Sequence, residues 1–311
     1  MTSSGSVTFG LLLPSREFAM YPPHDGNPRR LVDLAVRAEQ AGLDAAWIGD
    51  SLLAKPRAEP LLVLAAAAAV TERIDLGTAV LLAAMRPAAQ LAQQAATVDA
   101  LSGGRLILGV GAGPGLPQVR DDFDLVGADF DRRGGRMMEV VHDARELWRA
   151  TDAPTDLRLQ PMCATGGGPR MWLGGSGPRG LERAGRHFDG WFPTAPVVDD
   201  FAGQLAAVRA AAADGGRDPA TITAAAYLTI NIGEPTAAAA EVAEHSMLYY
   251  GVEIAVLEKI MGTKSGTAAE VGAWLQSYID AGCEHLCIRL ASPCVDTQLD
   301  RLVELLPQLR T

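Results

Sequence analysis

Short apolar runs alternate with segments of helical periodicity along most of the chain. The first run, residues 7–14, is rich in β-forming side chains and stops at a proline, which predicts a strand. In the next segment Leu31, Leu34 and Ala38 recur at helical spacing, and Gly42 then closes the predicted helix. The same order repeats, with further strands expected at residues 45–49, 74–82, 105–111, 171–175, 190–194, 221–232 and 285–290. Further helices are expected at residues 60–72, 87–101, 131–148, 178–186, 201–213, 236–250, 268–281 and 297–309.

This alternation indicates a parallel sheet that is covered by helices, because its strands are nearly continuous apolar runs. About eight strand–helix units predict an α/β fold of the (βα)8 TIM-barrel type, with an open doubly wound sheet as the alternative. The 311 residues fit one such domain, so we expect a single domain over residues 1–311. Three segments exceed a minimal barrel and are interpreted as inserted loops or short helices, at residues 114–129, 150–169 and 251–266.

Composition narrows the possible partners. The net charge is −10 and no clustered basic face is visible, so a nucleic-acid partner is not expected. The longest apolar stretch, residues 61–70, is too short to cross a bilayer, and the N-terminal segment lacks a basic signal region, which predicts a cytoplasmic protein. The four cysteines form no CxxC pair, so we expect reduced thiols and no metal site. An anionic ligand would need a local basic pocket in so acidic a chain.

Two glycine-rich loops each follow an apolar run, at residues 109–115 and 174–178. Glycine lets a backbone turn at positive φ and approach a ligand closely. A helix that starts after such a loop points its first amide groups at that ligand, which suits a phosphate. Since barrel enzymes place their chemistry at the carboxyl ends of their strands, the loops predict a ligand site there.

Four groups of motifs occur in order along nearly the whole chain: Leu-Gly-Thr-Ala-Val-Leu-Leu at 76–82, Asp-Ala-Leu-Ser-Gly-Gly-Arg-Leu-Ile-Leu-Gly-Val-Gly-Ala-Gly at 99–113, Arg-Gly-Gly-Arg-Met-Met-Glu at 133–139, and residues 173–177 with 184–186 and 189–191. Together they resemble the bacterial luciferase-like superfamily of flavin- and coenzyme F420-dependent oxidoreductases. The resemblance implies a barrel that binds FMN or the 5-deazaflavin F420, acts on a small organic molecule and frequently forms a homodimer. It also implies a flavin or F420 reductase as a partner. The 76–80 and 175–178 runs look closer to the deazaflavin branch, so F420 is expected and FMN is the alternative.

The resemblance also implies roles for particular residues. Asp50 matches a position near the cofactor ring, and Ala79–Val80 matches a bulge with a non-proline cis peptide that presses on the ring face. Residues 111–113 match backbone contacts to the ring or its side chain, and residues 174–178 match a phosphate loop. The expected cofactor-binding residues are Asp50, Ala79, Val80, Leu82, Gly111, Ala112, Gly113, Gly174, Gly175, Ser176, Gly177 and Pro178.

Two departures bear on the reaction. The deazaflavin-dependent sugar-phosphate dehydrogenases have a histidine and a glutamate where this chain has Ser51 and Pro114. Without that acid–base pair, hydride transfer that reduces an activated C=C or C=N bond is expected rather than alcohol oxidation. An FMN-dependent monooxygenase that uses reduced flavin and oxygen, and a barrel that binds flavin without turnover, are the alternatives.

The remaining candidate residues have competing interpretations. Asp50, Ser51 and His24 are candidate catalytic groups, although an aspartate or serine at a strand end is also a common helix cap. Arg16, Phe18 and Tyr21 follow the first strand and are candidates for a substrate pocket, with an ordinary surface loop as the alternative. Arg133, Arg136 and Glu139 are expected to fix a helix through ion pairs, whereas Arg179 and Arg183 either neutralise a phosphate or are solvated charges.

Overall fold

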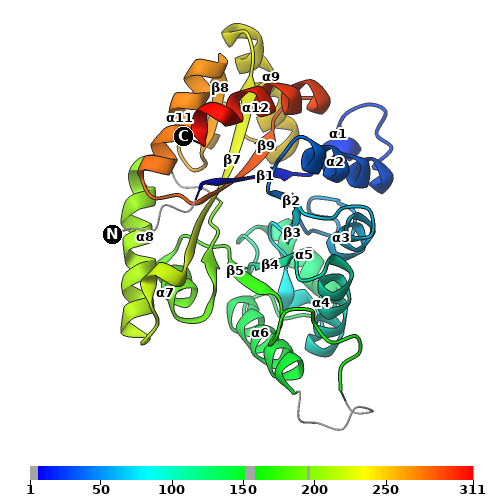
Figure 1. Cartoon of the computed structure of the whole chain (residues 1–311). Helices are drawn as coiled ribbons and strands as arrows, with labels where there is room; N and C mark the ends of the chain where they lie inside the picture. The colour runs from blue at the N-terminus through cyan, green and yellow to red at the C-terminus, as the bar shows by residue number, and fades with distance from the viewer. Residues whose placement is uncertain (1–5, 151–157, 195–196, 311) are drawn as a thin grey trace.

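Eight parallel strands close into a barrel in the computed structural model, which describes residues 6–150, 158–194 and 197–310 (Figure 1). The strands are β1 (Thr8–Leu12), β2 (Ala45–Ile48), β3 (Asp75–Thr78), β4 (Leu106–Val110), β5 (Arg170–Leu173), β6 (Gly190–Trp191), β7 (Thr223–Ile232) and β9 (His285–Leu290). Each of the first seven pairs with the next, and β9 pairs with both β7 and β1, which closes the ring. This closure confirms the predicted TIM barrel, and the alternative prediction of an open doubly wound sheet is wrong.

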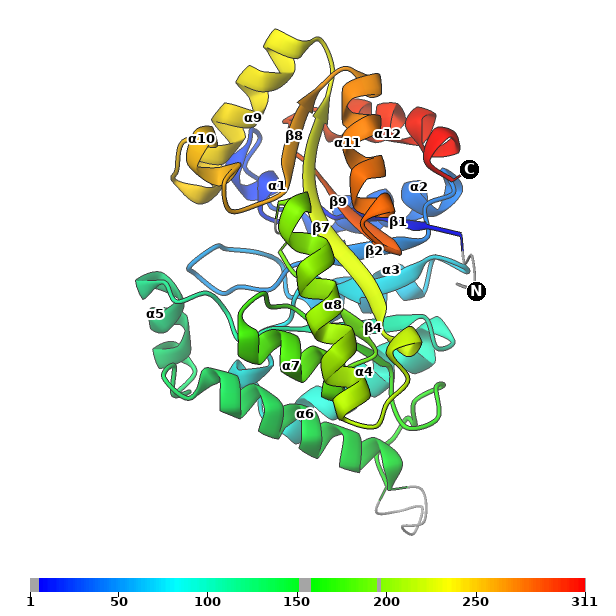
Figure 2. The same cartoon turned by 90° about the vertical axis from the view of Figure 1, so that its left-hand side faces the viewer.

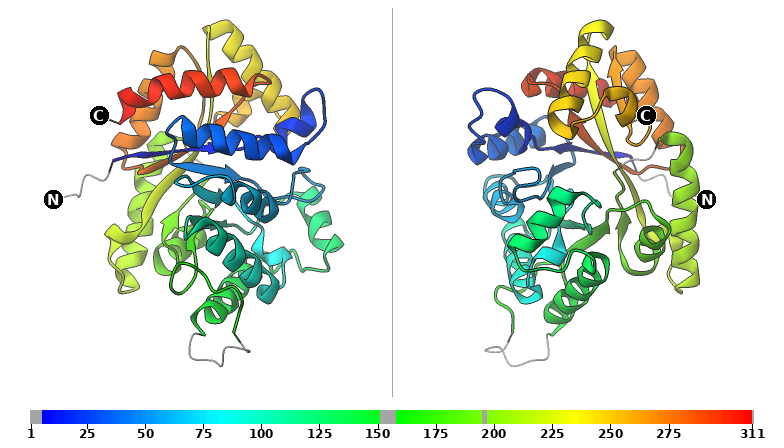
Figure 3. Two further views of the ribbon diagram at one scale, coloured as in Figure 1. Left: turned by 45° about the vertical axis from the view of Figure 1, so that its right-hand side comes forward. Right: turned by 180° about the vertical axis from the view of Figure 1, so that it is seen from behind.

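The main helices surround the barrel (Figure 1). They are α2 (Pro28–Gln40), α3 (Pro60–Ala68), α4 (Ala88–Ser102), α6 (Arg133–Arg149), α7 (Pro178–His187), α8 (Val198–Asp214), α9 (Pro235–Tyr250), α11 (Ala268–Asp280) and α12 (Val295–Leu309). The first and last of these, α2 and α12, lie side by side (Figure 3), where Arg37 is ion-paired with Asp296 and, at 2.5 Å, with Asp300. Among the described helices, none is both long and apolar enough to cross a bilayer.

The segments that connect the main strands and helices contain short elements. These are α1 (Glu17–Met20), η1 (Ala83–Met85), α5 (Pro117–Leu125), η3 (Pro219–Thr221), α10 (Ile254–Leu257) and β8 (Thr263–Gly266). The ten-residue β7 extends well past β6, so its second half is free to pair with β8 (Figure 2). Sequence patterning did not predict β8, because its four residues are polar or small. Of the segment 150–169, residues 151–157 lie outside the described part of the chain.

Large aromatic side chains fill the inside of the barrel. Trp47 on β2 packs against Trp172 on β5, with ring centroids 5.1 Å apart, and donates a hydrogen bond from Nε1 to His285 Nε2 at 2.9 Å. Burial lowers the pKa of His285 to about 3, so the ring is neutral and can accept that bond. The neighbouring strands supply glycine beside Trp47: a Cβ at Gly10 would lie 2.4 Å from its Nε1, and one at Gly77 would lie 2.2 Å from its ring. Glycine is required at both positions because the indole occupies the space of a side chain.

We expect Gly77→Ala to destabilise the protein by about 1–3 kcal/mol, because the added methyl group overpacks the barrel interior against Trp47. Gly203→Ala is the matched control, since Gly203 lies exposed within α8 and a Cβ added there would have no atom within 4 Å. That substitution should stabilise the protein by about 0.5–1 kcal/mol. Urea unfolding curves measure both changes, and equal stability of Gly77→Ala and the unsubstituted protein would contradict this packing.

Candidate functional site

A cavity of about 800 Å³ opens at the carboxyl ends of the barrel strands. Its walls include the segment after β2, the bulge after β3, the glycine-rich loops after β4 and β5, the middle of β7, and the ends of β9 and α9. Eleven of the twelve residues predicted to contact a cofactor line this one cavity, and the twelfth, Pro178, begins α7 next to it. The structure therefore brings together residues that the sequence places in four separate segments.

The bulge after β3 explains the glycines of both loops. The Ala79–Val80 peptide is cis, as the family resemblance implies, and the Val80 side chain stands between the two loops. A Cβ at Gly111 would lie 2.5 Å from Val80 Cγ2, and one at Gly174 would lie 3.1 Å from Val80 Cγ1. A Cβ at Gly109 would lie 2.1 Å from the Thr78 carbonyl oxygen. Glycine is needed here for close approach to the bulge, before any ligand is considered.

The loop after β5 has the features of an anion-binding site. It leads into α7, whose N-cap residue Gly177 has no side chain to cap the first amide groups. Ser176, Arg133 and Arg183 line the cavity at this end. A smaller hollow of about 390 Å³ adjoins it and is lined by a single acidic residue, Asp131, and by four arginines: Arg132, Arg133, Arg179 and Arg183. Of the two interpretations of Arg179 and Arg183, this placement favours phosphate neutralisation.

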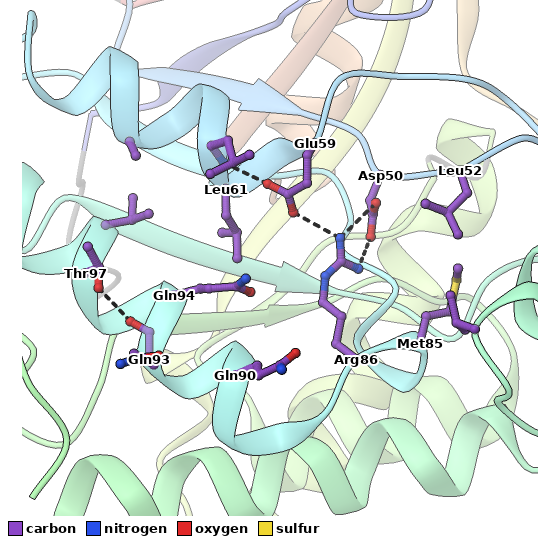
Figure 4. Close-up of a pocket in the computed structure, with 14 residues that line it drawn as sticks. Asp50, Leu52, Glu59, Leu61, Met85, Arg86, Gln90, Gln93, Gln94 and Thr97 are labelled. Carbon is purple, nitrogen blue, oxygen red and sulfur yellow. Dashed lines mark hydrogen bonds and ion pairs between the residues drawn. The ribbon is translucent and has the colours of Figure 1, made fainter.

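Asp50 is held by neighbouring groups rather than left free in the cavity. Its carboxylate is 6% exposed and ion-paired with Arg86 at 2.5 Å, and it accepts a hydrogen bond from the Leu82 backbone N–H at 2.9 Å. Arg86 also contacts Glu59 at 3.2 Å, so one guanidinium bridges two carboxylates (Figure 4). Asp50 thus fixes the backbone that follows the Val80 bulge, between the main cavity and a second hollow of about 420 Å³.

The other two candidate catalytic groups differ in placement. Ser51 lines the cavity, but its Oγ accepts a hydrogen bond from the Lys55 backbone N–H at 2.9 Å and donates one to Asp122 at 3.3 Å. It therefore caps a turn, which was the alternative interpretation. His24 is exposed and lies outside the cavity lining, with its Nδ1 at 3.1 Å from the Ala19 carbonyl oxygen.

The three candidate substrate residues form a layer behind the cavity. Phe18 is buried beneath Arg30, and Tyr21 stacks on the buried ring of His245. The guanidinium of Arg16 lies 4.4 Å from the centroid of the Tyr249 ring, on which His245 also stacks. These residues support the cavity wall from outside rather than line it.

A polar group that the sequence did not reveal lines the cavity opposite the phosphate-type loop. We call it the Lys55 cluster, and its members are Lys55, Arg57, Tyr227, Tyr249, Tyr250 and Arg289. They come from the segment after β2, from β7, from the end of α9 and from β9. In the closed strand order, β9, β1 and β2 face β4, β5 and β6, so the cluster and the glycine loops lie across the barrel mouth from each other.

Arg289 organises this cluster from a position that is 3% exposed. It donates hydrogen bonds to the hydroxyls of Tyr250 and, at 2.5 Å, of Tyr249, and it is ion-paired with the buried Glu17 at 3.3 Å. Arg57 donates to the same Tyr249 hydroxyl. Within the described part of the chain, Arg57 Nε and Nη1 are buried and have no hydrogen-bond partner.

Lys55 lies with its Nζ 4.6 Å from the centroid of the Tyr250 ring. Burial, and secondarily the charges of Arg16, Arg289 and Arg57, lower the pKa of Lys55 to about 7. An amine that loses its proton near neutral pH can act as a base or an acid, as well as bind an anion. Sequence patterning missed this group because a lysine in a polar segment is usually solvated.

Comparison with known proteins identifies the family. The model of the luciferase-like monooxygenase family matches residues 7–282, so the chain belongs to this family of oxidoreductases, as its motifs predict. The phthiodiolone/phenolphthiodiolone dimycocerosates ketoreductase of Mycobacterium bovis (strain BCG / Pasteur 1173P2) is 32% identical over an alignment of length 228, which covers 62% of this chain and 58% of the ketoreductase. The chain therefore spans less than two thirds of the length of that relative. An F420-dependent glucose-6-phosphate dehydrogenase of Kineococcus radiotolerans is 30% identical over an alignment of length 302, which covers 83% of this chain and 86% of the dehydrogenase.

Solved structures share the fold at lower identity. An F420-dependent secondary alcohol dehydrogenase in complex with an F420-acetone adduct superposes with a TM-score of 0.82 at 20% identity, covering 99% of this chain and 100% of that one. A monooxygenase from Streptomyces bottropensis superposes with a TM-score of 0.76 at 22% identity, covering 97% of this chain and 99% of that one. The shared barrel thus occurs in both deazaflavin-dependent and monooxygenase enzymes.

We expect one lysine of the folded protein to titrate near pH 7. The chain has three lysines, so ¹³C-dimethylation followed by NMR gives few signals, and Lys55→Met identifies the one that shifts. The unfolded chain holds this proton up to about pH 10.4, so between about pH 7 and that value the free energy of unfolding should rise with pH relative to Lys55→Met. A Lys55 signal that stays protonated until pH 10 would contradict the desolvated environment.

Proposed function

We propose that the protein is a coenzyme F420-dependent oxidoreductase that transfers a hydride between the deazaflavin and a small organic substrate, most naturally to an activated C=C or C=N bond. One observation carries the proposal: an apolar bulge and a loop of glycines flanked by arginines line the same cavity. The relative from Kineococcus radiotolerans, which matches most of this chain, is named as F420-dependent and supports the choice of cofactor.

The residues of the cavity fit both parts of such a cofactor. Val80, Leu82, Leu173 and Phe192 form an apolar wall for a flat ring. The loop at residues 174–178 takes the phosphate at the start of α7. Space is available there because a Cβ at Gly177 would have no atom within 4 Å. Arg133 and Arg183 supply positive charge beside this loop.

The surroundings of Ser51 and Pro114 favour reduction over alcohol oxidation. Both line the cavity, but Pro114 has no ionisable group and the Ser51 hydroxyl is engaged in its turn. When bound, the reduced deazaflavin supplies a hydride, and the double bond gains that hydride together with a proton. Lys55, Tyr227 and Tyr250 carry the exchangeable protons on the opposite wall. Asp50 acts as a positioning residue through Arg86 and Leu82.

We expect F420 to bind with a dissociation constant in the micromolar range or below, as measured by quenching of its fluorescence. Gly177→Asp should weaken this binding by about tenfold or more, which is about 1.4 kcal/mol, because it places negative charge at the phosphate. Gly177→Ala is the matched control, since open space surrounds this position and the methyl group adds no charge.

The outcomes separate the cofactor from its alternatives. Binding of FMN alone would overturn the choice of F420 and favour the monooxygenase, which oxygen consumption with reduced FMN would then test. Tight F420 binding without turnover of any enone or imine in a broad panel would favour a barrel that binds flavin without catalysis. Equal affinity of Gly177→Asp and Gly177→Ala would mean that the phosphate lies elsewhere.

We also infer that the chain forms a homodimer, as its family resemblance implies. Leu52, Leu62 and Val126 are large apolar side chains, each more than 40% exposed, and they gather around the hollow beside α3 and α4. Apolar patches of this kind are typical of protein interfaces. The mass of one chain is 32.7 kDa, so light scattering should give twice that value, and Leu62→Glu should lower it. A monomeric mass for the unsubstituted protein at micromolar concentration would contradict the inference.

A further inference from the structure

The charges that line the cavity are unequal. Of its described lining residues, one is acidic and five are basic: Asp50, Lys55, Arg57, Arg133, Arg183 and Arg289. The carboxylate of Asp50 is already paired with Arg86. The positive charge therefore exceeds what the surrounding protein neutralises, in a chain whose net charge is −10.

The excess lies at two separate places. Arg133 and Arg183 stand beside the glycine loop, where the proposed cofactor phosphate would neutralise them. Lys55, Arg57 and Arg289 lie across the barrel mouth from that loop. A ligand group that reaches the glycine loop cannot also neutralise the Lys55 cluster, so the second excess needs its own explanation.

Among the described residues, the Lys55 cluster contains buried hydrogen-bond donors that have no partner. Arg16 lies behind it, so four cationic side chains act on one another here, and the buried carboxylate of Glu17 is ion-paired with one of them, Arg289. Within the described residues, Arg57 Nε and Nη1 are buried without a partner. Unpaired buried donors and like charges in contact are costly, and proteins retain them where a ligand completes the set.

We propose that the Lys55 cluster binds an anionic group of the substrate, a carboxylate or a phosphate, with Lys55 and Arg57 as the contacting cations and Arg289 as the residue that positions Tyr249 and Tyr250 around it. This inference rests on the proposed function for the word substrate, whereas the anion site itself does not depend on the cofactor. The substrates are then small anionic molecules whose reducible bond lies between the anionic group and the cofactor ring.

Proton linkage gives this site a signature that the glycine loop lacks. The Lys55 ammonium is destabilised by burial and by the charges of Arg16, Arg289 and Arg57, while the carboxylate of Glu17 is ion-paired with Arg289. An anion beside Lys55 favours its charged form, so anion binding near pH 7 should take up part of a proton. Anion binding at Arg133 and Arg183 should not, because arginine keeps its proton.

The first experiment uses sulfate, which stays fully ionised near neutral pH, and the protein without cofactor. Calorimetric titration at pH 7 in two buffers that differ in ionisation enthalpy should show binding with proton uptake. Lys55→Met should abolish the proton uptake and weaken the sulfate affinity of this site by about tenfold or more. Lys55→Arg should restore the sulfate affinity without the proton uptake. That result would also show that the lower affinity of Lys55→Met is not caused by misfolding.

Arg183→Ala is the control from the other end of the cavity, and it should leave the proton uptake unchanged. The proposal is overturned if the unsubstituted protein binds no sulfate, if Lys55→Met retains both affinity and proton uptake, or if Arg183→Ala alone removes the binding.

A second experiment tests the substrate class with reduced F420. For an enone that carries a carboxylate, kcat/KM should exceed that of its methyl ester by about tenfold or more, and Lys55→Met should remove this preference. Equal rates for acid and ester would overturn the assignment of the substrate class. If neither compound is reduced while the sulfate result stands, the proposed reaction is wrong and the anion site remains supported.

Discussion

The close approach of the bulge after β3 to three glycines is the constraint on which the site depends, with the Val80 side chain against Gly111 and Gly174 and the Thr78 carbonyl against Gly109. The bulge after β3 projects Val80 into the mouth of the barrel, where the backbones after β4 and β5 would otherwise collide with it. Glycine at 111 and 174 removes those collisions, and glycine at 109 makes room for the Thr78 carbonyl oxygen. The hydrogen bond from the Leu82 N–H to Asp50 holds the chain beyond the bulge. The glycines that make room for the bulge also leave these positions of the two loops without side chains, so that the loop backbone lines one cavity. Packing and ligand access are therefore consequences of one steric arrangement.

Most of the fold could be predicted from the sequence because each element carries its own local signal. The apolar strands, the helix-ending glycines and the order of the motifs are features of short segments, and the closed barrel follows from their number and alternation. β8 could not be predicted, since Thr263–Gly266 is neither apolar nor alternating. It forms because β7 extends beyond its pairing with β6 and leaves residues free to pair with β8. Its formation is decided by the partner strand rather than by its own residues.

The candidate site likewise has parts that the sequence predicts and parts that it does not. The glycine loops and the Ala79–Val80 bulge are contiguous motifs, and they lie together in the structure as expected. The Lys55 cluster joins residues that are up to 234 positions apart, from Lys55 to Arg289, and each of them alone resembles an ordinary surface or core residue. The residues predicted for the substrate pocket lie one layer behind: Tyr21 stacks on His245 of α9, and Phe18 packs beneath Arg30 of α2. Spacing along one segment indicated the right region but not which side chains face the cavity.

The position of the positive charge inside the cavity bears on which ligands the cavity favours. The chain as a whole is acidic, so its long-range field does not draw anions inward, and a Debye length of about 8–10 Å limits that field in any case. Any preference for an anion must then come from desolvated contacts inside the cavity, where Arg57, Lys55 and Arg289 already lie close to one another without enough partners. Their mutual repulsion is a cost to folding that a bound anion relieves. A neutral molecule would leave it in place, so the same charges that reduce the stability of the empty cavity also discriminate between ligands.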